Sequence, residues 1–137
     1  MIVESRQVYI YEMKNLLVIE DDAPLSWLLD KILCKKYNVT TVHNGMDAWS
    51  WLSDGNVPDL IISDIKMPYV DGLELLENLC SSGLFKNIPV IVLSGISDRE
   101  VRQKCMDHGV VAYLVKPFEP QRLLDEIEQV FVSKMFL

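Results

Sequence analysis

The chain has 137 residues, of which 50% are hydrophobic and 24% are charged, and its formal net charge is −7. This length suits one globular domain and excludes two of ordinary size, and the composition excludes a disordered tail. Because the chain is acidic and has no basic run, we expect no direct binding to nucleic acid.

Targeting signals and cysteine pairs are both missing from the sequence. The N-terminus lacks the pattern of a signal peptide, and the longest apolar runs, about five residues, are far shorter than a membrane span. The three cysteines show neither a CxxC pair nor metal-ligand spacing, which favours buried, reduced thiols in helices. We therefore expect a cytoplasmic protein that does not enter the membrane.

Five strand and helix units follow one another along the chain. Short apolar strands are predicted over residues 16–19, 39–42, 60–63, 90–93 and 110–115. The helices between them are marked by Pro24 (ending near Tyr37), the Asn44-Gly45 turn, a loop with Pro68 and Gly72, the capping box Ser97 to Glu100 (ending near Gly109), and Pro120. This alternation predicts a doubly wound α/β fold, with a five-stranded parallel sheet covered by five helices.

One domain accounts for residues 14–134. Residues 1–13 precede the pattern and are predicted to be an N-terminal extension of unknown role. Met13-Lys-Asn-Leu16 looks like a natural start, so the preceding residues are either an extra edge segment or the product of an upstream initiation site.

Chemically capable residues follow four of the five predicted strands. In a parallel sheet all carboxyl ends lie on one edge, where ligands of such folds bind. Taken singly, each residue has an ordinary explanation: Asp21 or Asp22 as a helix cap, Asp64 or Ser94 as a turn residue. Their convergence on one edge favours a functional site, made of Glu20 and Asp21 after the first strand, Asp64 after the third, Ser94 after the fourth and Lys116 after the fifth.

The chemistry of this set is that of a metal and a phosphoryl group. Crowded carboxylates repel one another unless a proton or a cation compensates, and oxygen ligands alone favour Mg²⁺, with Mn²⁺ as a substitute. A carboxylate can also attack phosphorus if positive charge neutralises the phosphoryl oxygens. Lys116 and the metal would supply that charge, and the Ser94 hydroxyl could donate to a phosphoryl oxygen.

Four motifs together resemble the receiver domain of two-component response regulators, the CheY-like family, over roughly Lys14 to Phe131. The resemblance implies the flavodoxin-like strand order 2-1-3-4-5. It also implies that the chain works as a signalling switch and not as an enzyme on an external substrate. The motifs are Val18-Ile-Glu-Asp-Asp22, Asp64-Ile-Lys-Met-Pro68 with Asp71-Gly72, Ser94-Gly95, and Tyr113-Leu-Val-Lys-Pro-Phe118.

The resemblance also assigns roles to individual residues. Asp64 would be the phosphoacceptor and would receive its phosphoryl group from a histidine kinase or a histidine phosphotransfer protein. Lys116 would pair with that phosphoryl group. Mg²⁺ would be held by Glu20, Asp21, Asp64 and the backbone carbonyl of Lys66. Ser94 and Tyr113 would switch the face of the fourth helix, fifth strand and fifth helix, which would meet a downstream protein or a second copy. Gly95 departs modestly from the family, which more often has Ala there.

Three other functions were weighed against this one. The chain could be a receiver cut from a longer DNA-binding regulator or hybrid kinase, or an interaction module that is never phosphorylated. A hydrolase acting through an aspartyl phosphate would need a second carboxylate two residues after Asp64, where Lys66 stands.

Overall fold

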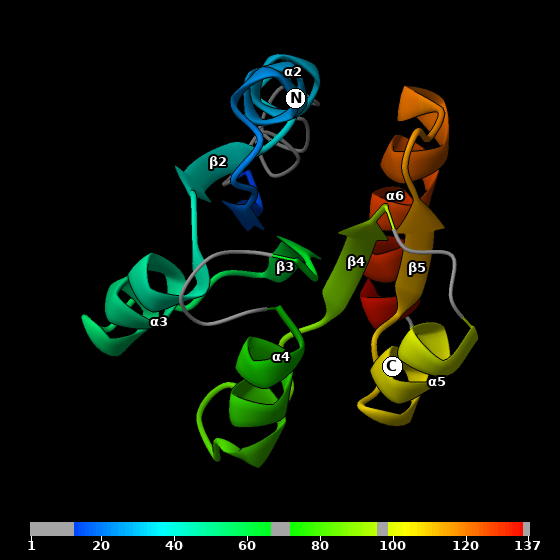
Figure 1. Ribbon diagram of the computed structural model, residues 1–137. Coiled ribbons are helices and arrows are strands. Elements are labelled where there is room, and N and C mark those ends of the chain that lie inside the picture. The colour runs from blue at the N-terminus through cyan, green and yellow to red at the C-terminus, as the bar shows by residue number, and fades with distance from the viewer. Residues whose placement is uncertain (1–12, 67–71, 96–98, 136–137) are drawn as a thin grey trace.

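The computed structural model describes residues 13–66, 72–95 and 99–135. Within them, five strands form one parallel sheet in the order β2-β1-β3-β4-β5 (Figure 1). Both the predicted fold and the predicted strand order are therefore confirmed. Residues 1–12, Pro68, Asp71 and Ser97 lie outside the described residues. The strands are β1 (Asn15–Ile19), β2 (Asn38–Val42), β3 (Leu60–Asp64), β4 (Val90–Ser94) and β5 (Ala112–Val115).

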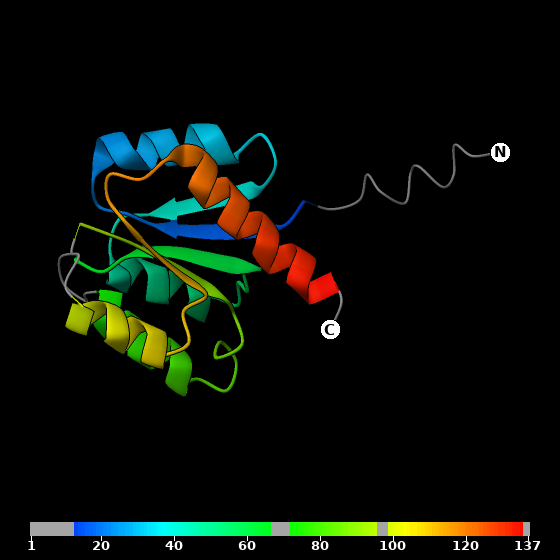
Figure 2. The ribbon, with the colours of Figure 1, turned by 90° about the vertical axis from the view of Figure 1, so that its right-hand side faces the viewer.

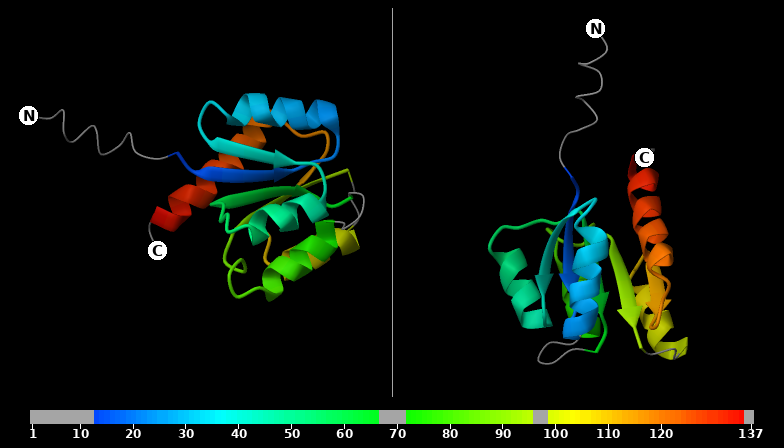
Figure 3. Two further views of the ribbon diagram at one scale, coloured as in Figure 1. Left: turned by 90° about the vertical axis from the view of Figure 1, so that its left-hand side faces the viewer. Right: turned by 90° about the horizontal axis from the view of Figure 1, so that it is seen from above.

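Helices cover both faces of this sheet, as Figures 2 and 3 show. Side chains alternate along β1, so that Leu16 and Val18 pack with α2 and α6, whereas Leu17 and Ile19 pack with α3, α4 and α5. Burial on both sides explains why the strands are unbroken apolar runs. The helices are α2 (Ala23–Leu33), α3 (Gly45–Ser53), α4 (Gly72–Ser81), α5 (Arg99–Asp107) and α6 (Pro120–Met135).

Several element boundaries differ from the sequence prediction, and two of these differences have a clear local cause. The first described helix, α2, ends at Leu33 and not near Tyr37, because a tight turn follows in which the Tyr37 N–H donates to the Leu33 carbonyl at 2.9 Å. That turn delivers the Tyr37 ring into the core. The fifth strand begins at Ala112 and not at Val110, after Gly109 adopts a positive φ of 83° and closes the end of α5.

The thiols are free, as expected, but they are not equally buried. Cys105 is buried and Cys80 half-buried, and burial raises the pKa of both thiols above the usual value. Cys34 is exposed, because α2 ends one residue before it. Among the described helices, none combines the length and apolar character that a bilayer crossing demands.

Candidate functional site

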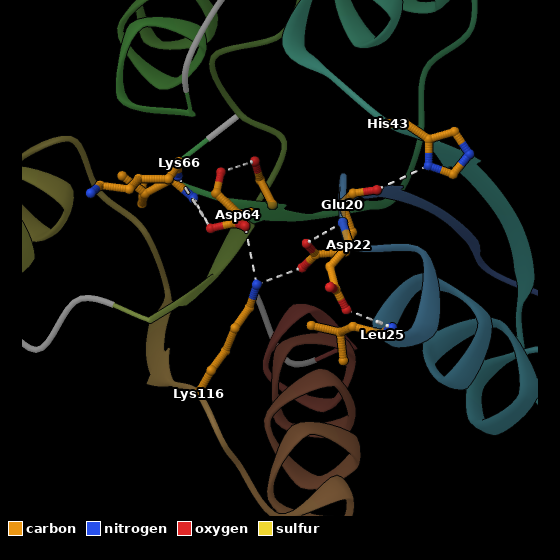
Figure 4. Close-up of polar contacts among 9 residues, drawn as sticks. Glu20, Asp22, Leu25, His43, Asp64, Lys66 and Lys116 are labelled. Carbon is orange, nitrogen blue, oxygen red and sulfur yellow. Dashed lines mark hydrogen bonds and ion pairs between the residues drawn. The ribbon is translucent and has the colours of Figure 1, made fainter. Parts of the chain in front are cut away.

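Three of the predicted site residues, Glu20, Asp64 and Lys116, meet at the carboxyl edge of the sheet (Figure 4). Pairing of Ile19 with Ser63 puts the ends of β1 and β3 at one level. Pairing of Asp64 with Leu93, and of Ser94 with Val115, extends this level to β4 and β5. The residues that end or follow these strands are therefore neighbours, although they are far apart in the sequence.

Asp64 is the last residue of β3, and its carboxylate is buried at the centre of the site. One oxygen, Oδ1, accepts hydrogen bonds from the backbone N–H groups of Ile65 at 2.6 Å and Lys66 at 3.2 Å. The other, Oδ2, accepts from the Lys116 ammonium at 3.0 Å. These donors orient both oxygens and stabilise the ionised carboxylate.

Glu20 lies directly after β1 and is only 1% exposed. Its Oε2 accepts from the Asp22 N–H at 3.2 Å, and its buried Oε1 lies 2.9 Å from the Lys116 ammonium in an ion pair. Burial raises the pKa of the Glu20 carboxyl above its usual value, the nearby charge of Asp64 adds to the rise, and Lys116 opposes it. The positive charge of Lys116 therefore does not fully offset the cost of burying the Glu20 carboxylate.

Lys116 follows β5 and bridges the two carboxylates. Its backbone N–H donates to the Ser94 carbonyl at 2.8 Å, and the Lys116–Pro117 peptide bond is cis. Burial by itself lowers the pKa of the ammonium, but the interactions with Glu20 and Asp64 outweigh it, so the pKa lies above its usual value. Lys116 is therefore a permanent positive charge at neutral pH.

Three carboxylates could hold a metal ion together. Glu20, Asp21 and Asp64 each offer an oxygen, and these oxygens lie within 4.8 Å of one another. A donor set of carboxylate oxygens alone, without nitrogen or sulfur, suits a hard cation such as Mg²⁺. The residues present therefore fit Mg²⁺. The Lys66 carbonyl stays a predicted ligand.

Asp21 and Asp22 are neighbours in the sequence but take part in different features of the structure. Asp21 belongs to the cluster, whereas Asp22 is the N-cap of α2, where its Oδ2 accepts from the Leu25 N–H at 2.9 Å. The structural explanation for an acidic residue before Pro24 is thus correct for Asp22 and not needed for Asp21.

The two predicted switch residues lie on β4 and β5, the strands that follow β3 in the sheet. Ser94 ends β4 one residue beyond the level of Asp64 and is fully buried. Tyr113 lies on β5, is 7% exposed, and lines a groove of about 430 Å³ together with Arg102 and Arg122. The groove is formed by residues of α5, β5 and α6, which are the fourth helix, fifth strand and fifth helix of the sequence prediction. The predicted partner face therefore contains a depression.

Two residues near the acids were given no site role by the sequence prediction. Gly72 approaches the Asp64–Ile65 peptide so closely that an added Cβ would overlap the Asp64 carbonyl oxygen and lie 2.6 Å from Ile65 Cα. The Gly72 N–H also donates to the Ile65 carbonyl at 2.7 Å. The second is His43, whose Nδ1 lies 3.0 Å from the Glu20 carbonyl oxygen. Its position directly after β2, next to β1, was the available signal.

Proteins with related sequences identify the family of this chain. The family model for the response regulator receiver domain matches residues 16–128. The chain is 31% identical over 128 residues to hybrid signal transduction histidine kinase D of Dictyostelium discoideum, an alignment that covers 93% of this chain and 8% of the kinase. It is 35% identical over 112 residues to the two-component response regulator-like protein PRR37 of Oryza sativa subsp. indica, covering 81% of this chain and 15% of that protein.

A solved receiver structure has a similar fold. Chemotaxis response regulator CheY4 of Vibrio cholerae superposes with a TM-score of 0.78 at 28% sequence identity, covering 86% of this chain and 98% of that one. The chain spans only a small part of the kinase and of the rice protein, but nearly all of CheY4. Fold, motif order and family match agree, and the chain belongs to the response regulator receiver domains of two-component signalling.

Proposed function

We propose that this chain is a phosphorylatable receiver whose Asp64 accepts a phosphoryl group from a histidine kinase or a histidine phosphotransfer protein. Receiver domains are signalling modules and not classical enzymes, so the only chemistry required is transfer to Asp64 and hydrolysis from it. The observation that carries the proposal is that the Asp64 carboxylate lies 3.0 Å from the Lys116 ammonium and shares one cluster with the two other acids.

The transfer needs a nucleophile and neutralisation of charge. An Asp64 carboxylate oxygen would form the new O–P bond while the P–N bond of a phosphohistidine donor breaks, and the electron pair of that bond leaves with the imidazole nitrogen. Mg²⁺ held by Glu20, Asp21, Asp64 and the Lys66 carbonyl would neutralise negative charge on the phosphoryl oxygens. Lys116 would contribute its ammonium to the same oxygens, and its raised pKa keeps that charge in place.

Signalling would then follow from a new acceptor at the edge of the sheet. The Ser94 hydroxyl would donate to a phosphoryl oxygen, and Tyr113 would respond on the neighbouring strand, where it pairs with Val92. The groove that Tyr113 lines belongs to the face of α5, β5 and α6. This face would meet a downstream protein or a second copy of the chain. The receiver domain would comprise residues 14–134, with residues 1–13 as an extension of unknown role, and the protein would act in the cytoplasm.

Intact-mass spectrometry after incubation with acetyl phosphate tests the proposal. Wild-type protein should gain one phosphoryl adduct in the presence of Mg²⁺ and none in EDTA, and the adduct should resist acid and be lost in base. Asp64→Asn should gain none. An equal adduct on Asp64→Asn would disprove Asp64 as the acceptor, and no adduct on folded wild-type protein would favour an interaction module that is never phosphorylated.

A second candidate follows from the lengths of the relatives. The chain spans 8% of the Dictyostelium kinase and 15% of the rice regulator. It could therefore serve as the receiver part of a longer hybrid kinase or DNA-binding regulator. An antibody against this domain, used on extracts of the source cells, would separate the two: a band at the mass of this chain supports a single receiver, and a much larger band supports the longer protein.

A further inference from the structure

The His43 side chain contacts the backbone at the start of the acidic cluster. Figure 4 shows the ring beside Glu20, with Nδ1 3.0 Å from the Glu20 carbonyl oxygen. A carbonyl oxygen can only accept, so Nδ1 carries the proton and donates it. The ring itself is exposed, whereas the Glu20 side chain is buried.

This contact replaces a strand hydrogen bond that β2 cannot supply. The ladder between β1 and β2 ends with the pair of Ile19 and Val42, and the Glu20 N–H adds one more bond, to the Val42 carbonyl at 3.0 Å. Beyond Val42 the chain turns into α3, whose N-cap is Asn44. The His43 side chain therefore donates to the Glu20 carbonyl where the next residue of a longer strand would have done so.

We infer that His43 is a positioning residue for the metal-binding carboxylates. Its bond holds the plane of the Glu20–Asp21 peptide, which joins two of the three residues of the acidic cluster. The Glu20 side chain is also held by burial and by Lys116, but Asp21 is exposed, so its direction depends on this peptide. Groups that orient metal ligands change metal affinity without touching the metal. The inference rests on the proposed function and deepens it.

Calorimetric titration of the full chain with MgCl₂ tests the inference. His43→Ala should raise the dissociation constant for Mg²⁺ about tenfold, because the peptide is no longer held. His43→Asn should bind close to the wild-type level, because its amide nitrogen occupies the position of Nδ1 and can donate in the same way. An unchanged dissociation constant in His43→Ala, or an Asn variant as weak as Ala, would overturn the inference.

The second histidine of the chain provides a matched control. His108 Nδ1 lies 2.7 Å from the Lys104 carbonyl oxygen, the same kind of contact at the end of α5. His108→Ala should therefore bind Mg²⁺ as wild type does. A fall in thermal stability of His43→Ala without any change in Mg²⁺ binding would reveal a purely structural role and contradict the inference.

Failure of the inference and failure of the proposed function give different results. If wild-type protein binds no Mg²⁺, the proposed metal site is wrong and the inference falls with it. If wild-type and His43→Ala proteins bind Mg²⁺ equally, only the inference is wrong. Long-range ¹H–¹⁵N spectra of the neutral ring give a separate readout: His43 should be protonated on Nδ1, and protonation on Nε2 would remove the donor and contradict the inference.

Discussion

The Lys116 ammonium lies 3.0 Å from Asp64 Oδ2, although the two residues are 52 positions apart. The same ammonium lies 2.9 Å from Glu20 Oε1, and its side chain is 22% exposed. One cation thus compensates two buried carboxylates at the edge of the sheet. This arrangement makes Lys116 important for the stability of the protein without metal, in addition to its proposed part in phosphoryl transfer.

Replacement of Lys116 by Met should therefore destabilise the metal-free protein. The variant keeps an apolar stem but leaves two buried carboxylates without a counter-charge, at a cost of about 2–3 kcal/mol, reduced from that of a fully buried pair by partial exposure. Mg²⁺ should stabilise the variant more than it stabilises wild type, because the ion supplies the missing charge. Urea unfolding with and without Mg²⁺ measures both effects.

Lys36→Met is the control for the loss of a lysine. Lys36 pairs with Glu128 at 3.8 Å on the surface, with side chains 65% and 60% exposed. Exposed pairs contribute little, so this variant should stay within about 0.5 kcal/mol of wild type. Equal destabilisation of the two variants would contradict the role given to Lys116.

Alanine variants of Asp21 and Asp22 should have different effects, one on Mg²⁺ binding and the other on helix capping. Asp22→Ala removes the hydrogen bond to the Leu25 N–H and should lower the free energy of unfolding by about 1 kcal/mol, with little change in Mg²⁺ affinity. Asp21→Ala removes an exposed proposed ligand and should weaken Mg²⁺ binding while the free energy of unfolding stays within about 0.5 kcal/mol. Unfolding in EDTA and Mg²⁺ titration of both variants provide the comparison, and a reversed pattern would refute the division.

The raised pKa of Glu20 should make the metal-free protein less stable as the pH rises. The folded state binds this proton more tightly than the unfolded state, so the carboxyl favours folding at acid pH. That contribution is lost as the pH rises from the usual value of 4.5 through the higher pKa of the folded state. Glu20→Gln should lack this part of the pH dependence. Unfolding midpoints in EDTA across that range test it, and parallel curves for the two proteins would show that the shift is wrong.

Gly72→Ala should displace Asp64, the proposed phosphoacceptor. The added Cβ would overlap the Asp64 carbonyl oxygen, so either β3 or α4 must move, at a cost of about 2–3 kcal/mol. Phosphorylation by acetyl phosphate should slow, because the Asp64 carboxylate moves relative to Lys116. Gly83→Ala is the control, since a Cβ there meets nothing within 4 Å. If Gly72→Ala folded and reacted like Gly83→Ala, the close approach would have no consequence.

Much of this architecture could be read from local patterns. Unbroken apolar runs such as residues 90–93 identified buried strands, and acids, hydroxyl and ammonium after those strands identified the edge that carries the site. This works because burial on both faces of a parallel sheet imposes a composition that a short segment displays by itself. The end of α2 could not be read in this way, since Leu33 is followed by a turn whose hydrogen bonds depend on the final position of Tyr37.

The amino-acid sequence by itself determined the alternation of strands and helices, the strand ends that carry Glu20, Asp64 and Lys116, and the family to which the motifs point. Only the tertiary structure decided that one ammonium serves two carboxylates, that Gly72 lies against the Asp64 peptide, and that His43 donates to the Glu20 carbonyl. The physical reason is range: hydrophobic periodicity acts between neighbours in sequence, whereas these contacts depend on how β1, β2, β3 and β5 align, and that alignment is set by packing of the whole sheet.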